Sequence, residues 1–404
     1  MVSSKAIDLA FTKALPKIEL HAHLTGSISR QCLREIWLQK KAKNAELDIM
    51  DPYIAMPQGK VDFTLDTFFQ VFTNMIHQLC TDSESLRYST RSVLQDFERD
   101  GIRYLELRTT PRESLDQGIS KEKYISTVLD TIDEYRSEQM STYLIISVDR
   151  TKPASDALEA IDLAIKYQGR GVVGVELGGN PTRGDVRIFR LAFNKAKAHG
   201  LKLTLHFAES VFSSSPDELN TLLSYEPDRL GHVIHVPDDI KDEITRRKIG
   251  LELCLSCNVH GKLIQGGFPD HHFGYWIHQE CPVLLSTDDV GFFCSPLSNE
   301  YLIAAESFDL DRGMVIDMCK KGISAIFAGP EEKKRLYNLL SEFEAQNIKT
   351  ANTTMLVGNT AQNQDALYLF SFLPALSQSI LELCFSRQRP DFVHPMLVLW
   401  GAYR

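Results

Sequence analysis

The chain of 404 residues has no long apolar run, which argues against a membrane-spanning protein. No stretch of about 18 uncharged apolar residues occurs, so the sequence predicts no membrane-spanning helix. Residues 1–17 lack the apolar core of a secretory signal peptide. We therefore expect a cytoplasmic protein, in the cytosol, with no membrane partner.

Basic segments are also missing, although the chain contains 44 Lys and Arg residues. The formal net charge is -9 and the isoelectric point is near 5.8. No Lys-rich or Arg-rich stretch offers the positive surface that nucleic acids attract. We expect no nucleic-acid partner, and any nucleotide ligand should be a small molecule.

Cysteine is sparse, and its spacing excludes a disulfide framework. Eight cysteines are spread over the whole chain. Cys254 and Cys257 have CxxC spacing, but neither a second CxxC nor a following His pair completes a zinc ribbon. The run from Leu251 to Cys257 is typical of a strand. We predict free thiols and a structural role for this pair.

A GxGxxG motif after the first apolar run is absent, which argues against a dinucleotide-binding fold. The chain instead alternates apolar runs with amphipathic, helix-like stretches, which indicates parallel strands covered by helices. The eight runs are residues 17–24, 101–108, 142–149, 172–178, 201–208, 230–236, 250–257 and 281–287. Eight such units predict a (β/α)8 TIM barrel, with a doubly wound open sheet as the alternative.

The connection after the first predicted strand is unusually long, from Thr25 to Asp100. It contains the aromatic-rich segment Phe63 to Phe72. An insertion at this position lies at the catalytic face of a barrel. We predict extra helices that form part of a substrate lid, with His77 as a substrate contact. Additional core helices that bury a hydrogen-bonded histidine are the alternative interpretation.

The sequence divides into a barrel, residues 1–349, and a C-terminal tail, residues 350–404. The tail begins with Asn, Thr and Gln and continues with an interrupted apolar run, Leu367 to Phe385. A partly disordered tail and a tail that packs on the barrel both stay open. Nothing requires a partner subunit, so we expect a monomer.

Polar and ionisable residues follow nearly every predicted strand. Burying such groups costs several kcal/mol unless they are paired or bound to a metal, so a whole ring of them is not accidental. In a barrel they would meet at the C-terminal mouth. In chain order they are His21, His23, Arg108 to Arg112, Asp149, Glu176 to Asn180, His206, Glu209, His232, His235, Asn258, Asp288 and Asp289.

Three histidines and one carboxylate of this ring form a candidate zinc site. The alternation of a strand sends His21 and His23 to the same face. His206 and Asp288 complete a set of nitrogen and oxygen donors that holds one Zn²⁺ and leaves a position for water. Glu209 is close enough to act as an acid or base on a substrate; the alternative is a carboxylate favoured by a helix N-terminus.

Five motifs, taken in order, resemble those of the adenosine and AMP deaminase family. The resemblance covers roughly residues 15–345 and implies a zinc-containing (β/α)8 barrel that hydrolytically deaminates C6 of a purine. The nucleic-acid deaminase signature, His-x-Glu with Pro-Cys-x-x-Cys, is absent. The motifs are His21-Ala-His23-Leu-Thr-Gly-Ser, Glu176-Leu-Gly-Gly179-Asn, His206-Phe-Ala-Glu209-Ser, Arg229-Leu-Gly-His232 and Ser286-Thr-Asp288-Asp289.

The resemblance also implies roles for individual residues. Glu209 would protonate purine N1, and His232 would orient the water, take its proton or stabilise the developing charge. Asp289 would hold the water and contact the ring. The backbone at Gly179 would approach purine N3, where a side chain would block the approach. The zinc ligands would be His21, His23, His206 and Asp288.

Thr25 departs from the family pattern. Adenosine deaminases proper typically have Asp at this position, where it contacts the ribose 5′ hydroxyl. A carboxylate would repel a 5′-phosphate, whereas a hydroxyl would not. The segment Thr109-Thr110-Pro111-Arg112 adds two hydroxyls and a guanidinium suited to phosphate oxygens. We therefore predict a purine nucleoside 5′-monophosphate as the small-molecule partner.

Within the family, this combination looks most like the adenosine deaminase-like proteins, which convert N6-methyl-AMP and related N6-substituted nucleotides to IMP and an amine. Ordinary adenosine deamination is the nearest alternative. A barrel that has lost activity and binds its ligand without turnover is another, and a surface ion pair is the alternative role for Arg112. The predicted substrate contacts are His23, Thr25, His77, Thr109, Thr110, Pro111, Arg112, Asp149, Gly179 and Asp289.

Overall fold

The computed structural model describes residues 6–364, and eight strands within them form one parallel sheet in sequence order. Each strand pairs in parallel with the next one along the chain. The strands are β1 (Lys17–His23), β2 (Ile102–Thr109), β3 (Ser141–Asp149), β4 (Val172–Gly178), β5 (Lys202–Phe207), β6 (Arg229–His232), β7 (Gly250–Leu253) and β8 (Val283–Leu285).

The first and last strands meet through the segment that follows β8. The amide of His23 donates to the carbonyl of Asp288 at 3.1 Å, and the amide of Asp288 donates to the carbonyl of His21 at 2.7 Å. An open, doubly wound sheet has no such contact between its edge strands. The predicted (β/α)8 barrel is therefore confirmed, and the same contact brings two predicted metal ligands from opposite ends of the barrel sequence together.

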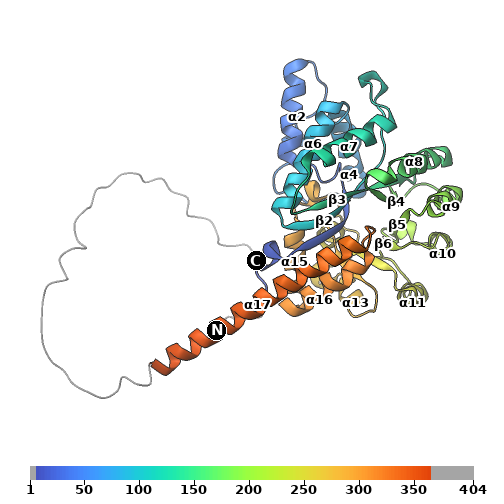
Figure 1. Cartoon of the computed structure of the whole chain (residues 1–404). Helices are drawn as coiled ribbons and strands as arrows, with labels where there is room; N and C mark the ends of the chain where they lie inside the picture. Colours follow the sequence, from blue (N-terminus) through green and yellow to red (C-terminus); the bar gives the residue numbers. More distant parts are fainter. Residues whose placement is uncertain (1–5, 365–404) are drawn as a thin grey trace, which may run out of the picture. The chain divides into compact units, whose positions relative to one another are not determined.

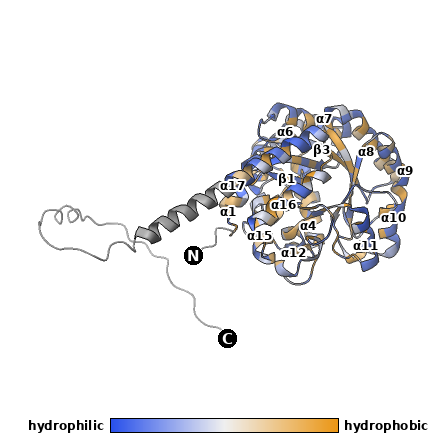
Figure 2. Ribbon diagram, turned by 60° about the horizontal axis from the view of Figure 1, so that its bottom comes forward, coloured by the Kyte–Doolittle hydropathy of each residue, from blue (hydrophilic) through white to orange (hydrophobic). Residues whose placement is uncertain are grey.

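Helices surround the sheet, and α8 to α11 follow one another around it (Figure 1). Each buries a stripe of residues spaced by three or four, as α8 does with Ala157, Ala160, Ile161 and Ala164. Figure 2 accordingly shows hydrophobic and hydrophilic colours on the same helices. Outside the insertion after β1, the helices up to residue 322 are α1 (Leu9–Ala14), α7 (Lys121–Tyr135), α8 (Ala154–Tyr167), α9 (Arg190–Ala198), α10 (Pro216–Leu223), α11 (Asp238–Arg247), α12 (Leu255–His260), α13 (Phe273–Trp276), α14 (Val290–Phe293), α15 (Leu297–Phe308) and α16 (Arg312–Gly322).

Three predicted strands are too long, and of these the run 281–287 forms a strand only at Val283–Leu285. The run 230–236 stops being a strand at His232, because His232 and Val233 adopt left-handed backbone angles, with φ of 66° and 48°. The run 250–257 ends as a strand at Leu253, and α12 begins at Leu255. The carboxylate of Glu300 accepts the amide of Ser256 at 3.0 Å, which satisfies a donor in the first turn of that helix.

The long connection after β1 does contain extra helices, as predicted. Its aromatic segment packs on α14, where Phe72 stacks on Phe292 with ring centroids 4.9 Å apart. Phe68 lies 4.7 Å from the same ring. The insertion holds α2 (Arg30–Lys43), α3 (Pro52–Ala55), α4 (Leu65–Val71), a π-helical turn (Phe72–Ile76), α5 (His77–Leu79) and α6 (Ser83–Arg99).

The last described helix, α17 (Pro330–Gln364), runs across the expected boundary at residue 349. Residues up to Lys349 form one compact unit, and residues from Thr350 belong to a second. The predicted apolar run Leu367 to Phe385 lies outside the described residues. Within residues 6–364, no helix combines the length and apolar character that crossing a bilayer requires.

Candidate active site

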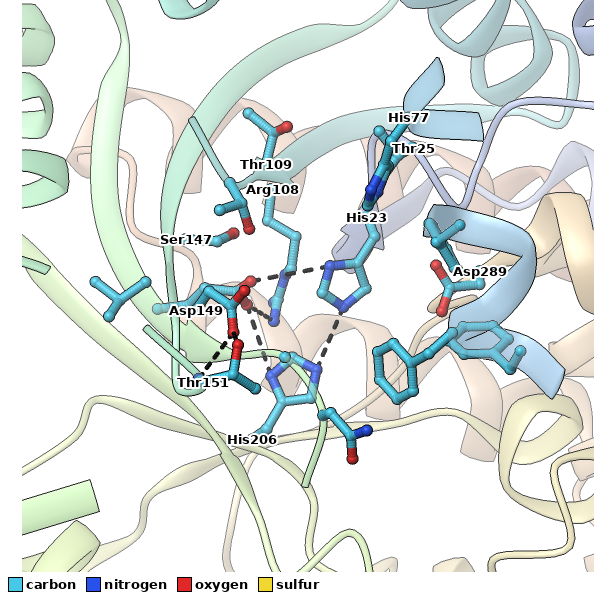
Figure 3. A pocket seen from close by; sticks show the side chains of 18 of the residues that line it. His23, Thr25, His77, Arg108, Thr109, Ser147, Asp149, Thr151, His206 and Asp289 are labelled. Atoms are coloured by element: carbon cyan, nitrogen blue, oxygen red, sulfur yellow. Dashed lines mark hydrogen bonds and ion pairs between the residues drawn. The ribbon is translucent and has the colours of Figure 1, made fainter. Parts of the chain in front are cut away.

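A cavity of about 650 Å³ opens at the carboxyl ends of the strands. Polar side chains from several strands and from the insertion after β1 point into it (Figure 3). The lining includes all the predicted substrate contacts. The structure therefore gathers on one surface residues that are up to about 260 positions apart in the sequence.

The predicted metal ligands converge in this cavity. Nε2 of His206 lies 3.2 Å from Nε2 of His21 and 3.3 Å from Nε2 of His23. Oδ1 of Asp288 lies 3.5 Å and 3.2 Å from the same two nitrogens of His21 and His23. Donors held about 2.0–2.1 Å from a tetrahedral zinc ion are about 3.3 Å apart, so these spacings suit such an ion. Figure 3 shows His23 and His206 facing each other.

In His21 and His206, the hydrogen bond that Nδ1 makes determines which ring nitrogen carries the lone pair. Nδ1 of His206 lies 3.1 Å from the carbonyl of Leu177, which can only accept, so Nδ1 carries the hydrogen. Nδ1 of His21 likewise donates to Glu252 at 2.7 Å. In the neutral rings both Nε2 atoms then present lone pairs to each other, an arrangement that a cation between them relieves. The donor set therefore fits a divalent metal.

A buried ion network supports the candidate metal site from inside the barrel. Glu252 accepts from His21, Arg108 and Arg229, and none of these four side chains is exposed. Arg108 also pairs with Glu176 on β4. Burial opposes ionisation of Glu252, yet the two guanidinium groups hold its pKa well below the usual range. Breaking such a network leaves a buried charge unpaired, so Glu252 fixes the orientation of His21.

Glu209 follows β5 and faces the same cavity. Burial, together with the negative charge of Asp288, raises the pKa of Glu209 to about 8. At neutral pH this side chain is therefore mainly a protonated acid. A buried carboxylic acid beside a cavity can give a proton to a basic nitrogen of a ligand, which is the role expected for Glu209.

Asp289 lies beside Asp288 but in a different environment. Burial and the neighbouring Asp288 charge raise the pKa of Asp289, whereas contacts with His21 and His23 hold that of Asp288 low despite burial. Oδ1 of Asp289 has no hydrogen-bond partner among the described residues. A Cβ on Gly26 would lie 1.4 Å from this oxygen, which explains the glycine in the first motif. Oδ1 of Asp289 is thus free to form a hydrogen bond with a ligand in the cavity.

The predicted substrate contacts differ in whether their polar groups already have hydrogen-bond partners within the protein. The hydroxyl of Thr109 is 2.8 Å from that of Tyr124, and Oδ1 of Asp149 accepts two bonds from Thr151. Arg112 makes no hydrogen bond or ion pair with any residue in the described part, although burial lowers its pKa. Nε2 of His77 is buried without a partner in the same part of the chain. Arg112 and His77 are therefore the contacts most available to a ligand.

Gly179 occupies a position that only glycine suits. Its φ is +95°, and a Cβ there would lie 2.5 Å from Oδ1 of Asp149. Both the backbone angle and the close approach exclude a side chain. The main chain at Gly179 is consequently exposed to the cavity, as the predicted approach to a purine requires.

Several cavity residues were not predicted from the sequence. Ser147 and Thr151 line the cavity without belonging to a recognisable motif, and Glu252 lies within a strand. Cys257, expected to be structural, lines the cavity, and its thiol lies 2.8 Å from Oδ2 of Asp288. The seven cysteines in the described residues are free thiols, as predicted. Strand alternation on β7 was the one available signal for Glu252.

Three buried histidines make stability sensitive to acid. Burial lowers the pKa of His77 and His271 to about 2 and that of His272 to about 4. The unfolded chain binds these protons first, so stability is present above about pH 6.5 and is lost as the pH falls. Together these three histidines should lower the free energy of unfolding by about 4 kcal/mol per pH unit between pH 6 and 5, while carboxyl groups with a raised pKa, such as Glu209, contribute a change of opposite sign.

Urea unfolding at pH 7, 6 and 5 measures this dependence. His77→Gln should reduce the slope by about 1.4 kcal/mol per pH unit, since it removes one of the three protons. The matched control is His199→Gln, at an exposed position after α9, which should leave the slope unchanged. A slope in His77→Gln equal to that of the wild type would contradict the expectation.

The chain as a whole matches a known family. The family model described as adenosine deaminase matches residues 16–343. A Danio rerio protein named N6-methyl-AMP deaminase is 38% identical over 350 residues, covering 84% of this chain and 98% of the relative. This chain belongs to the adenosine deaminase family. The Homo sapiens protein named N6-methyl-AMP deaminase is 36% identical over 338 residues, covering 81% and 92%.

Solved structures of adenosine deaminase relatives share the fold. The structure of Arabidopsis N6-mAMP deaminase MAPDA gives a TM-score of 0.77 at 33% identity, covering 82% of this chain and 99% of that chain. An ADAL–IMP complex gives a TM-score of 0.78 at 32% identity, covering 84% and 100%. Together with the family match, these relatives support a deaminase of the hydrolase class.

Proposed function

We propose that this chain is a zinc-dependent deaminase of purine nucleoside 5′-monophosphates that acts at C6. Its preferred substrates are N6-methyl-AMP and other N6-substituted forms of AMP, which it converts to IMP and an amine. Relatives named N6-methyl-AMP deaminase support the substrate class, as does the IMP bound to a related structure. The observation that carries the proposal is the unpaired guanidinium of Arg112, which lines the same cavity as Thr25.

Each residue of the proposed site has its own role in the reaction. His21, His23, His206 and Asp288 would hold Zn²⁺, which makes a water molecule more acidic when it is bound. Glu209 protonates purine N1, so that C6 accepts the oxygen of water. Asp289 holds that water and accepts its proton. Asp289 then gives that proton to the leaving nitrogen, the bond between C6 and the amine breaks, and the remaining hydroxyl proton returns to Glu209 as C6 becomes a carbonyl. The main chain at Gly179 lies against the ring.

Arg112 and Thr25 account for a preference for the nucleotide. A partly buried guanidinium without a carboxylate partner favours an anion, and a phosphate accepts two parallel hydrogen bonds from it. Thr25 offers a hydroxyl in place of a carboxylate and so adds no repulsion. Lys121 lines the same cavity, but its ammonium is already paired with Asp156 and Glu159. Among the described residues, the cations of the cavity without a carboxylate partner are Arg112, Lys152 and Arg183, and Arg112 is the most buried of the three.

The proposal is tested by turnover of N6-methyl-AMP, AMP and adenosine with purified, zinc-analysed protein, followed by the loss of aminopurine absorbance. We expect the highest kcat/KM with N6-methyl-AMP. A preference for adenosine would leave the barrel chemistry intact but remove the phosphate argument. No turnover of any substrate by protein that holds zinc would favour a non-catalytic binding protein.

Arg112→Ala should lower kcat/KM for the nucleotide roughly 10- to 100-fold, because a hydrogen-bonded charge contact contributes about 1.5–3 kcal/mol. Its effect on adenosine should be within about threefold, since the nucleoside lacks the phosphate. The matched control is Lys121→Ala, which removes a cation from the same cavity that is already paired. An unchanged ratio of nucleotide to nucleoside turnover in Arg112→Ala would rule out the phosphate contact.

A further inference from the structure

Behind His232, the side chains of Asn258 and His271 and the backbone amide of Phe273 form a hydrogen-bonded row that the proposed mechanism does not use. The amide of Phe273 donates to Nδ1 of His271 at 3.0 Å. Nε2 of His271 lies 3.0 Å from Oδ1 of Asn258, and the amide nitrogen of Asn258 lies 3.1 Å from Nδ1 of His232. His232, Asn258 and His271 are at most 2% exposed, so water does not interrupt the row.

The direction of every bond in this row follows from its first member. A backbone amide can only donate, so Nδ1 of His271 accepts and carries no hydrogen. Burial lowers the pKa of His271 to about 2, so the ring is neutral and its single hydrogen is on Nε2. That hydrogen requires an acceptor, which is Oδ1 of Asn258. The amide NH₂ of Asn258 must then face His232 and donate to Nδ1.

We infer that Asn258 and His271 are positioning residues that hold His232 as its Nε2–H tautomer and make Nε2 a hydrogen-bond donor toward the candidate metal centre. This inference rests on the proposed function for its catalytic consequence. The assignment does not depend on how the Asn258 amide was oriented, because the Phe273 amide alone fixes the polarity of the row.

The surroundings of Nε2 of His232 fit a hydrogen-bond donor whose acceptor is a ligand. It lies 3.8 Å from Oδ2 of Asp288 and has no hydrogen-bond partner within the described residues. A buried donor without a partner costs about 1–3 kcal/mol unless a ligand accepts from it. The attacking water is such a ligand, and a donor stabilises negative charge as it develops on the oxygen.

The tautomer decides between the roles considered for His232. A ring that already holds a hydrogen on Nε2 cannot take a proton there, so in the resting enzyme His232 orients the water and stabilises charge. Proton acceptance then falls to Asp289, whose Oδ1 is free.

The backbone around His232 is held in place by the same cluster. His232 and Val233 have left-handed φ angles of 66° and 48°, which cost energy for residues with a side chain. Nε2 of His272 donates to the carbonyl of His232, and its ring stacks on His271 with centroids 4.1 Å apart. These contacts compensate for the strain and keep the His232 ring facing the row.

The wild-type tautomer is measured by long-range ¹H–¹⁵N correlation spectra of protein labelled with ring-¹⁵N histidine. The His232 signals are assigned by their loss in His232→Gln. We expect an unprotonated, pyridine-type Nδ1 and a protonated, pyrrole-type Nε2. A protonated Nδ1, alone or together with Nε2, would overturn the inference. This result needs no substrate, so it is independent of whether the proposed activity is found.

Asn258→Asp reverses the direction of the hydrogen bond between position 258 and His232 and keeps the shape of the side chain. An aspartate has no NH₂ group to give, so Nδ1 of His232 must become the donor and should shift to the pyrrole type. Asn180→Asp is the matched control: it adds a charge to the cavity but keeps a local turn in which Oδ1 accepts from Thr182. An Nδ1 that stays unprotonated in Asn258→Asp would show that Asn258 does not set the tautomer.

His271→Phe provides a second, uncharged variant. It removes the Nε2–H donor and leaves the Asn258 amide free to turn, so His232 should show both tautomers. With the preferred nucleotide, we expect kcat to fall roughly 100-fold in Asn258→Asp and roughly tenfold in His271→Phe, with KM within about threefold and zinc content unchanged. A rise in KM at constant kcat in both variants would contradict a role that acts through His232 on the chemical step.

Discussion

Glu209→Gln is expected to lower kcat by at least about a thousandfold while the metal content stays unchanged. General acid catalysis contributes about 10²- to 10⁴-fold, and this reaction depends on protonation of purine N1 to make C6 reactive. Glutamine keeps the shape of the side chain but has no acidic proton. The measurement is steady-state kcat with the preferred nucleotide, together with metal analysis of the same sample.

The control for this substitution is Glu113→Gln, which changes an exposed carboxylate that lines the same cavity. It should retain kcat within about threefold, since nothing in the structure couples Glu113 to the reacting atoms. If Glu209→Gln retains more than about a tenth of wild-type kcat, Glu209 is not the acid and the assigned mechanism is wrong.

Glu209 also determines whether kcat/KM rises or falls with pH. The pKa of Glu209 is about 8, raised by burial and by Asp288. The acid form exists below that pKa, so kcat/KM should be steady near pH 7 and decline about tenfold per unit once the pH exceeds about 8. The positive charge of a bound metal moves this midpoint downward, but the sign of the dependence is unchanged.

The barrel and its mouth could be predicted because both leave strong local signals. Eight apolar runs separated by amphipathic stretches define the fold, and polar residues at the strand ends locate the site. His21 and His23 are recognisable together because strand alternation gives them one face. Asp288 lies 265 residues beyond His23, and its motif was the reason to group it with His21 and His23. In the structure, backbone hydrogen bonds at the closure of the barrel join Asp288 to both histidines.

The interior charges could not be predicted, because their partners lie on strands far apart in the sequence. Glu252 and Arg108 are each one charged residue in an apolar run, and only the barrel brings them to 2.8 Å. Two of the overextended strands have a similar cause. The left-handed turn at His232 and the start of α12 at Leu255 depend on tertiary contacts from His272 and Glu300, which sequence periodicity does not show.

Removal of the metal should abolish turnover, to below about 0.1% of the wild-type kcat, because the candidate site supplies no other means of making water acidic at neutral pH. The metal is removed by dialysis against a strong chelator. Adding Zn²⁺ should then restore both kcat and a content of one metal ion per chain. The thermal midpoint should also fall without the metal, since an ion that binds only the folded state stabilises it.

His206→Ala separates a loss of metal from a loss of fold. It removes the ligand whose Nε2 lies within 3.3 Å of both other imidazoles, so the variant should not retain zinc and should not recover activity when zinc is added. His199→Ala, at an exposed position, should bind zinc as the wild type does. Full turnover in chelated protein that is free of metal would exclude a metal-dependent reaction. Because His206→Ala removes one donor of the metal site, adding zinc should raise the thermal midpoint of the wild type more than that of His206→Ala.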